Sequence, residues 1–196
     1  MKVLSENKVY TFEETIKKSK FITYIGVVNT KEDLDQFINK YKRNDARHNC
    51  WAYKIGTDGN QYGYNNDGEP SGTAGEPLLK LLEVNNLTNI IIFCVRYFGG
   101  IKLGTGGLQK AYSNGAIQLL KTITTKKLEL LHLVTIKFEI QNQKAVLNCL
   151  RTLKVQNIVK HFDQNLVYFT FLIEELSKLE SVNKLVSVID DKWDYF

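Results

Sequence analysis

The stretch of this sequence best suited to chemistry runs from Arg96 to Ser113 and reads RYFGGIKLGTGGLQKAYS. It contains five glycines, with Arg96 and Lys102 beside them. Glycine is entropically costly, so this concentration indicates a backbone that turns tightly or approaches a ligand closely. Free backbone N–H groups and a helix dipole attract negative charge, so the stretch favours an anion. Thr105 is a candidate N-cap or a hydroxyl donor to phosphate.

Known phosphate-binding motifs do not fit this stretch. The P-loop pattern is absent, and the third glycine of a dinucleotide fingerprint would fall at Gln109. Tyr97 and Phe98 offer ring faces on which nucleic-acid bases could stack. The structural alternative is that the glycines only permit tight turns and close helix–sheet packing, with both rings in the core.

A second glycine-punctuated stretch, DGEPSGTAGEP at 67–77, holds both prolines of the chain and leads into another predicted helix. Together the two loops could form one pocket. Asp67 and Glu69 could bind a metal or act as a base, but such acids more often cap helices or pair with an arginine. The sequence leaves open whether Arg96 reaches solvent or is buried against one of these carboxylates, which would make the two motifs a structural clasp.

The remaining chemistry-bearing residues form no recognisable catalytic set, and the sequence does not say whether any reaction is catalysed. His48 is the only histidine near these motifs, and no Ser/His/Asp or Cys/His pattern can be assigned. The three cysteines form no CxxC pair, so we expect reduced, mostly buried thiols, no metal site and no cofactor. No signal peptide or membrane-spanning stretch is visible, so we expect a cytoplasmic protein without a membrane partner.

The elements that must position these motifs are strands and helices in alternation over the first two thirds of the chain. Strands are predicted at 9–15, 21–28, 47–56, 62–64 and 89–95, the last buried on both faces because NIIIFCV is continuously apolar. Helices are predicted after Thr30, which has a capping-box partner in Asp33, near Pro77 and from Leu108 onwards. Lys18 and Lys20 would point to the same side of a regular strand.

A different pattern begins near residue 130. Alternation predicts a strand at 134–140, followed by a helix at 146–153 and strands at 155–162 and 166–173. A last helix is predicted, with Ser177 and Glu180 as its capping box and an apolar face of Leu179, Val182, Leu185, Val186 and Ile189. This β-α-β-β-α order matches most of a ferredoxin-like α/β sandwich. We therefore expect an α+β protein of two domains, 1–129 and 130–196.

Charge is unevenly distributed between these two predicted domains. Residues 1–129 hold 18 Lys and Arg against 13 Asp and Glu, whereas residues 130–196 hold eight of each. The whole excess of five positive charges therefore belongs to the first domain, which suits an anionic partner such as nucleic acid or a phosphorylated ligand. An ordinary solvated surface with surplus lysines is the alternative.

Four motifs together resemble the bacterial YigZ-type members of the IMPACT family. They are KKSKFI at 17–22, ARHNCWAY at 46–53, DGEPSGTAGEPLL at 67–79 and VRYFGGIKLGTGGLQKAYS at 95–113. The resemblance implies a first domain folded like the second domain of a small-subunit ribosomal protein and domain IV of elongation factor G. It also implies a ferredoxin-like second domain. Gln109 departs from the hydrophobic residue expected there, so the first turn of that helix should be more exposed.

The resemblance also implies a role in translation or nucleic-acid binding, with no established catalytic residue. Eukaryotic relatives are linked to control of translation through a kinase regulator and carry a different additional domain, which we do not expect in this chain. That regulator is not expected in bacteria, so the resemblance does not imply the eukaryotic mechanism here. Our leading hypothesis is a translation-associated protein that binds RNA or the ribosome. The alternatives are an enzyme or sensor for a small phosphorylated ligand held between the two loops, and a protein–protein adaptor. The sequence does not give the oligomeric state.

Two groups of residues are the candidate site. The first would meet nucleic acid or phosphate and comprises Lys18, Lys20, Arg47, His48, Arg96, Tyr97, Phe98, Gly99, Gly100, Lys102, Gly104, Thr105, Gly106 and Gly107. The second, from the other loop, comprises Asp67, Glu69, Ser71, Gly72, Thr73 and Gly75.

Overall fold

The computed structural model describes residues 1–155, 157–182 and 184–195. Contacts divide the chain into two compact units, Met1–Leu128 and Glu129–Phe196. Each unit mixes helices and strands around a hydrophobic core of its own. The chain is therefore the two-domain α+β protein that the sequence predicted. No helix in the described ranges is long and apolar enough to cross a membrane.

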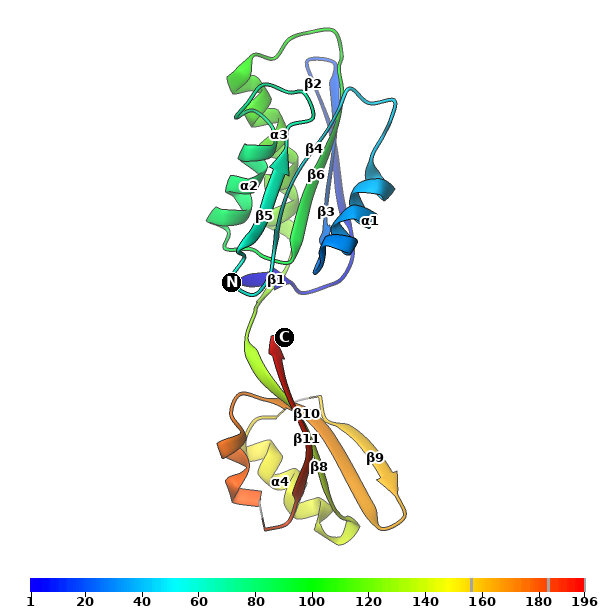
Figure 1. Cartoon of the computed structure of the whole chain (residues 1–196), viewed down its shortest axis with the longest axis vertical. Helices are drawn as coiled ribbons and strands as arrows, with labels where there is room; N and C mark the ends of the chain where they lie inside the picture. The colour runs from blue at the N-terminus through cyan, green and yellow to red at the C-terminus, as the bar shows by residue number, and fades with distance from the viewer. Residues whose placement is uncertain (156, 183, 196) are drawn as a thin grey trace. The chain divides into compact units, whose positions relative to one another are not determined.

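The first unit is built on a five-stranded antiparallel sheet in the order β2-β3-β6-β4-β5. A short ribbon of β1 and β7 pairs separately. The elements of this unit, seen in Figure 1, are β1 (Lys2–Leu4), β2 (Tyr10–Ile16), β3 (Ser19–Val27), α1 (Lys31–Tyr41), β4 (His48–Ile55), β5 (Gln61–Asn65), α2 (Gly75–Val84), β6 (Ile90–Tyr97), α3 (Thr105–Thr122) and β7 (Thr125–Lys127).

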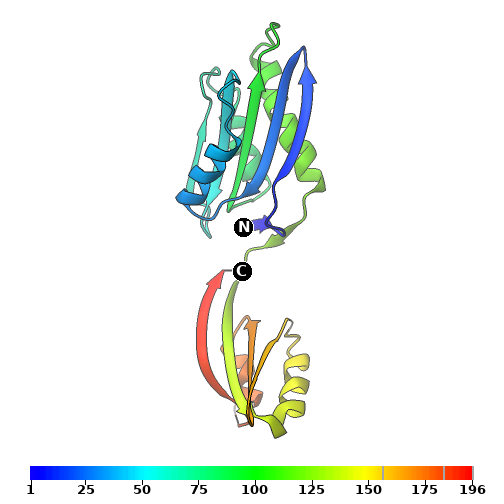
Figure 2. The same cartoon turned by 90° about the vertical axis from the view of Figure 1, so that its right-hand side faces the viewer.

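Helices cover both faces of this sheet. Helices α2 and α3 pack side by side on one face and α1 lies on the other, as Figure 2 shows from the side. The central strand β6 contributes to both cores, with Ile90, Ile92 and Cys94 on the α2–α3 face and Ile91, Phe93 and Val95 on the α1 face. All six side chains are fully buried. The prediction of a strand buried on both faces is confirmed.

Local signals fix the ends of several elements. Helix α1 begins with the predicted capping box, in which the side chains of Thr30 and Asp33 each accept a hydrogen bond from the other's backbone N–H. Pro77 lies in the first turn of α2, where a missing N–H costs little. The predicted common side for Lys18 and Lys20 is wrong, because β2 and β3 join through a two-residue turn. Lys17 and Lys18 form that turn with left-handed φ values of 45° and 65°.

The second unit is a four-stranded antiparallel sheet in the order β11-β8-β10-β9. Helix α4 and the 3₁₀ segment η2 contribute Val146, Leu150 and Leu179 to a core with the inward side chains of β8 and β10. The chain order of this unit is strand, helix, strand, strand, 3₁₀ segment, strand, and the first and last strands are adjacent in the sheet, which is ferredoxin-like. Its elements are β8 (Leu130–Glu139), η1 (Ile140–Asn142), α4 (Gln143–Thr152), β9 (Val159–Asp163), β10 (Leu166–Ile173), η2 (Leu176–Val182) and β11 (Ser187–Tyr195).

The predicted last helix is wrong. Residues 176–182 form only η2, and Ser187–Tyr195 form strand β11 along the outer edge of β8. The spacing of Val182, Val186 and Ile189 imitates a helix, but a β-bulge between Val188 and Asp190 shifts the alternation that would have indicated a strand. The hydroxyl of Ser177 bonds the carboxylate of Glu175 instead of forming the expected capping box. Strand β9 likewise begins four residues later than predicted.

Candidate functional site

The four motifs meet at one end of the five-stranded sheet, which we call the motif end. Strands β2, β5 and β6 finish there, β3 and β4 begin there, and helices α2 and α3 both start from loops at that end. It is the upper end of this unit in Figure 1. Antiparallel pairing therefore brings together segments up to about 80 residues apart in the chain, as the contact of Ser19 with Gly99 shows.

A buried ion pair between Arg96 and Glu69 is the centre of the motif end. The Nη1 of Arg96 donates to Oε1 of Glu69, and the two side chains are only 5% and 4% exposed. The hydroxyl of Tyr112 donates to the same Oε1 at 2.7 Å, and Nε2 of His48 lies 3.5 Å from it. This arrangement, which we call the clasp, joins the second loop to β6, α3 and β4. The question that the sequence left open is answered: Arg96 is buried, and its partner is Glu69.

Other groups complete the surroundings of Arg96. Its Nη2 lies 3.5 Å from the hydroxyl oxygen of Ser19, which also accepts from the backbone N–H of Gly99 at 3.2 Å. The guanidinium carbon lies 5.5 Å from the ring centroids of both Phe21 and Phe98. Rings at this distance favour a cation. The Nε of Arg96 is buried, and the described residues provide no hydrogen-bond partner for it.

Most polar groups of the second loop are already hydrogen-bonded to other groups of the protein. The carboxylate of Asp67 accepts a hydrogen bond from the backbone N–H of Asn49 at 2.6 Å. The backbone carbonyl oxygen of Asp67 lies 2.7 Å from Nδ1 of His48. Thr73 is buried and donates to the carbonyl of Pro70 at 2.6 Å. The backbone N–H of Gly75 donates to Asn66 at 2.8 Å. These bonds indicate a scaffold rather than a set of free ligands.

Glu76 organises the end of the second loop where α2 begins. Its Oε1 accepts from the backbone N–H of Gly72 at 3.1 Å and lies 3.4 Å from the hydroxyl of Ser71. Burial acts to raise the pKa of Glu76, but hydrogen bonds from the backbone N–H groups of Glu76 and Gly72 and from the side chains of Asn66 and Ser71 together lower that pKa. Glu76 is therefore a negative charge in the first turn of α2, where the helix dipole favours it.

The glycine-rich loop carries the start of α3 to the surface. The N-cap of α3 is Gly104, with φ of 76°, so the expectation that Thr105 caps this helix is wrong. Thr105 and Gly106 are exposed in the first turn, and no side chain caps it. Gln109, which the sequence placed in an exposed first turn, is exposed and donates to the carbonyl of Gly72 at 2.8 Å. This bond holds the two loops together.

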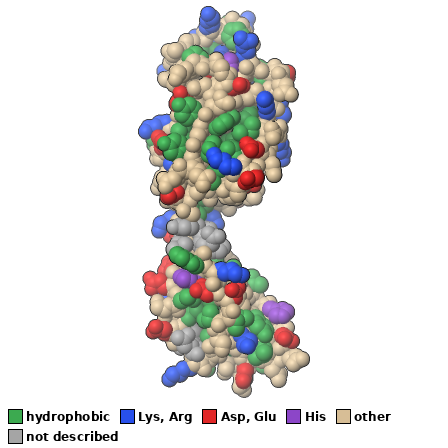
Figure 3. Space-filling model, in the orientation of Figure 1, with side chains coloured by type: hydrophobic (Ala, Val, Ile, Leu, Met, Phe, Trp, Pro, Cys, Tyr) green, Lys and Arg blue, Asp and Glu red, His purple; other side chains and the backbone are tan. Residues whose placement is uncertain are grey.

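The other basic side chains predicted to meet phosphate differ in whether they are already ion-paired. Lys18, Arg47 and Lys102 are exposed, and the described part of the chain gives their side chains no ion pair. Lys20 is paired with Glu13 at 2.7 Å. In Figure 3 blue Lys and Arg side chains gather at the upper end of this unit.

The two aromatic candidates differ in how much they expose. Phe98 is 48% exposed, although its ring also faces Arg96. Tyr97 is half-buried, and its hydroxyl donates to Asp45 at 3.2 Å. Phe98 is therefore the better placed of the two to stack on a base, and the packing of both rings in the core is not what the structure shows.

Sequence reasoning missed Ser19 and Tyr112 as members of the site. Both lie inside the quoted motifs, KKSKFI and LQKAYS, so their motif positions were the available signal. Tyr112 is fully buried, and burial raises the pKa of its hydroxyl, which keeps it a donor to Glu69. Burial likewise raises the pKa of the Cys94 thiol to about 12. That thiol is therefore an unreactive part of the core.

Comparisons with known proteins agree with the motifs. The model of the Impact N-terminal domain matches residues 17–120. An IMPACT family member of Haemophilus influenzae is 50% identical over 119 residues, which is 59% of this chain and 58% of that protein. The family member YvyE of Bacillus subtilis is 36% identical over 167 residues, 83% of this chain and 76% of that protein. The member YigZ of Escherichia coli is 44% identical over 121 residues, 60% and 59% of the two chains.

A solved structure extends the likeness to both units. The crystal structure of a hypothetical protein has a TM-score of 0.62 and 32% sequence identity, and the match covers 95% of each chain. The family model spans more than half of the 196 residues, and its range contains all four motifs. The chain belongs to the IMPACT family and is of the bacterial YigZ type.

Proposed function

We propose that this protein is a translation-associated regulatory protein that binds RNA through the motif end. The link to translation rests on membership of the IMPACT family, because the resemblance implies a role in translation or nucleic-acid binding for its bacterial members. The proposal of RNA as the ligand rests on charge. The excess of positive charge lies in the first two thirds of the chain, which contain the motif end.

The observation that carries this proposal is the convergence of three exposed cations from separate segments. Lys18 is in the turn between β2 and β3, Arg47 directly precedes β4, and Lys102 is in the glycine-rich loop. Beside them the uncapped first turn of α3 offers backbone N–H groups at the positive end of the helix dipole. Such a set can neutralise several consecutive phosphates without reading bases. The exposed ring of Phe98 adds a stacking surface.

In this proposal Arg96 supports the loops, whereas the sequence analysis placed it among the phosphate contacts. Its guanidinium bonds Glu69 inside the protein, so it holds the loops in place and leaves the phosphates to the exposed cations. Arg96 and Glu69 are paired with each other and buried, so neither is free to hold a small phosphorylated ligand between the two loops. For this reason the geometry favours RNA over the small-ligand alternative.

The test is RNA binding by the full chain across a salt series. For single-stranded RNA, log K should fall with log salt by roughly 0.7 per phosphate contact. Lys18→Ala with Lys102→Ala should remove about two contacts, flatten the slope by about 1.4 and weaken binding roughly ten-fold at low salt. The control is Lys121→Ala, an exposed residue in the last turn of α3, at the other end of that helix.

Two results would reject the proposal. One is the absence of binding to single-stranded, duplex and ribosomal RNA at low salt. The other is an equal loss of affinity in the control and in the double variant, which would mean that the charge of the whole unit, and not the motif end, attracts the RNA. A thermal shift with nucleotides or sugar phosphates in place of RNA would instead support the small-ligand function.

A further inference from the structure

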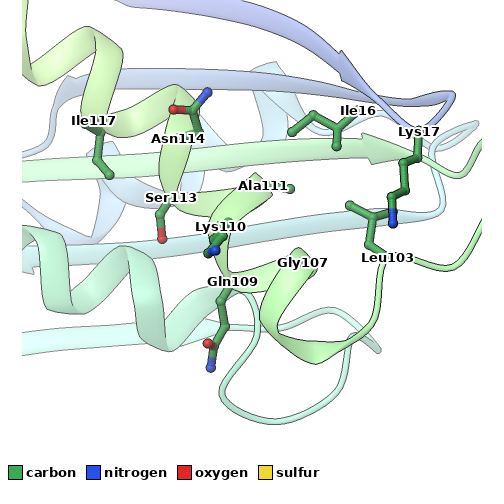
Figure 4. Close-up of a pocket in the computed structure, with 10 residues that line it drawn as sticks. All are labelled: Ile16, Lys17, Leu103, Gly107, Gln109, Lys110, Ala111, Ser113, Asn114 and Ile117. Carbon is green, nitrogen blue, oxygen red and sulfur yellow. The ribbon is translucent and has the colours of Figure 1, made fainter.

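A groove runs along α3 from the first turn of the helix to Ile117. It has a volume of about 600 Å³ and lies between α3, the end of β2 and the glycine-rich loop (Figure 4). Ile16 and Lys17 come from β2 and its turn, and Leu103 comes from the loop. The other lining residues are on α3: Gly107, Gln109, Lys110, Ala111, Ser113, Asn114 and Ile117.

The groove has an apolar wall and two available positive charges. Ile16, Leu103 and Ile117 supply large apolar side chains, and Ile117 is 37% exposed. Lys17 and Lys110 are exposed, and within the described residues neither side chain has an ion pair or hydrogen bond. None of the ten lining residues is acidic. An occupant should therefore combine apolar side chains with negative charge.

The amide side chains of the groove are already committed to the protein. Asn114 donates to Glu14 at 2.8 Å and accepts from Gln118 at 3.1 Å. Gln109 donates to the carbonyl of Gly72. An RNA base inserted here would find apolar walls but few free partners for its polar edge, and unpaired polar groups are costly to bury. A carboxylate of an occupant could pair with the ammonium groups of Lys17 and Lys110, and an apolar side chain of an occupant would need no hydrogen bond.

The dimensions suit a short peptide segment. The lining residues of α3 from Gly107 to Ile117 recur at helical spacing on one side and span about 15 Å at 1.5 Å per residue. A partner segment of about three helical turns would cover this length, and amphipathic segments commonly bind in apolar grooves of this kind. Charge complementarity with Lys17 and Lys110 then selects an acidic segment.

We propose that this groove is a docking site for an acidic amphipathic segment of a partner protein. The proposal does not rest on RNA binding. The groove shares Gly107 with the candidate RNA contacts, but Lys18, Arg47 and Lys102 do not line it and Ile117 is not among the proposed phosphate contacts. Apolar residues of the segment would pack on Ile16, Leu103 and Ile117. Its carboxylates would pair with Lys17 and Lys110. The protein would then join a partner protein to the nucleic acid at its motif end.

The test uses the full chain and a displayed library of random twelve-residue peptides. Peptides retained by the wild-type chain are counter-selected against Ile117→Glu, which places a negative charge in the groove. Val84→Glu is the matched control, because Val84 is an apolar residue of α2 that is 72% exposed and outside the groove. Thermal unfolding of both variants checks that they are folded.

The expected result is enrichment of peptides that are both apolar and net negative. Synthetic copies should bind wild type and Val84→Glu equally, and bind Ile117→Glu at least ten-fold more weakly. Lys110→Glu should weaken them similarly, whereas Lys121→Glu on the same helix should not. RNA affinity should be the same in Ile117→Glu and wild type.

Three outcomes would overturn the proposal. The first is that no peptide prefers wild type to Ile117→Glu. The second is that the enriched peptides are neutral or basic. The third is that Ile117→Glu weakens RNA binding while the Lys18 and Lys102 substitutions do not, which would assign the groove to RNA.

Discussion

At the scale of single residues, the clasp buries the arginine that lies beside the glycine-rich loop and pairs it with a carboxylate of the second loop. Burying one charge is unfavourable, but Glu69 compensates Arg96, and Tyr112 and Ser19 provide further hydrogen-bond partners. Removing one partner leaves the other charge buried without compensation. We therefore expect substitution of one partner of the clasp to lower the free energy of unfolding.

Glu69→Gln should lower the free energy of unfolding by about 3 kcal/mol, because Arg96 would remain as an uncompensated buried cation. Adding Arg96→Met to Glu69→Gln should recover part of this loss, since it removes that cation. Urea denaturation of the single and double variants measures both effects. Glu83→Gln, at an exposed pair with Lys80, should change stability by less than about 1 kcal/mol. Equal stability of wild type and Glu69→Gln would contradict a stabilising clasp.

At the scale of elements, the position of the glycine-rich loop depends on its contact with the turn between β2 and β3. A Cβ on Gly99 would lie 2.0 Å from the backbone carbonyl of Lys18, a distance that no rotamer change can relieve. This close approach explains a glycine at that position. It also sets the spacing between the loop with Lys102 and the turn with Lys18.

Gly99→Ala should therefore destabilise the first unit by about 1–3 kcal/mol, as overpacking does, and it should weaken RNA binding by moving the two lysines apart. Gly106→Ala is the matched control. A Cβ there meets nothing within 4 Å, and the residue lies in the first turn of α3, so alanine should be neutral or stabilise by up to about 1 kcal/mol. Thermal unfolding compares the two variants. If both behave alike, the contact with Lys18 does not constrain the loop.

Features of the fold and the site that depend on neighbouring residues could be predicted from the sequence, and those that depend on distant pairing could not. Continuous apolar character identified β6, and Thr30 with Asp33 identified the start of α1, because these signals are local. The choice of Glu69 over Asp67 as the partner of Arg96 depends on which side chain turns inward where β5 ends, and no spacing encodes that. Strand β11 was missed because its identity depends on pairing with β8, about 55 residues earlier. Local patterns fail where distant pairing decides the structure.

At the scale of the whole molecule, the two units have separate cores and different charges. The first unit closes on itself, because β1 pairs with β7 and the backbone N–H of Leu128 donates to the carbonyl of Met1 at 3.1 Å. Its positive charge and the motif end lie within the same unit. The second unit has a core of its own, but it is short and nearly neutral, and small domains are marginally stable.

Residues 1–128 expressed alone should therefore fold cooperatively and bind single-stranded RNA with the salt slope of the full chain. Circular dichroism and urea denaturation test the folding, and the same salt series tests the binding. A fragment that also lacks residues 1–4 should be less stable, because β7 then loses its partner strand. A folded fragment with a much smaller slope would mean that the second unit supplies phosphate contacts, and the RNA surface would then have to extend beyond the motif end.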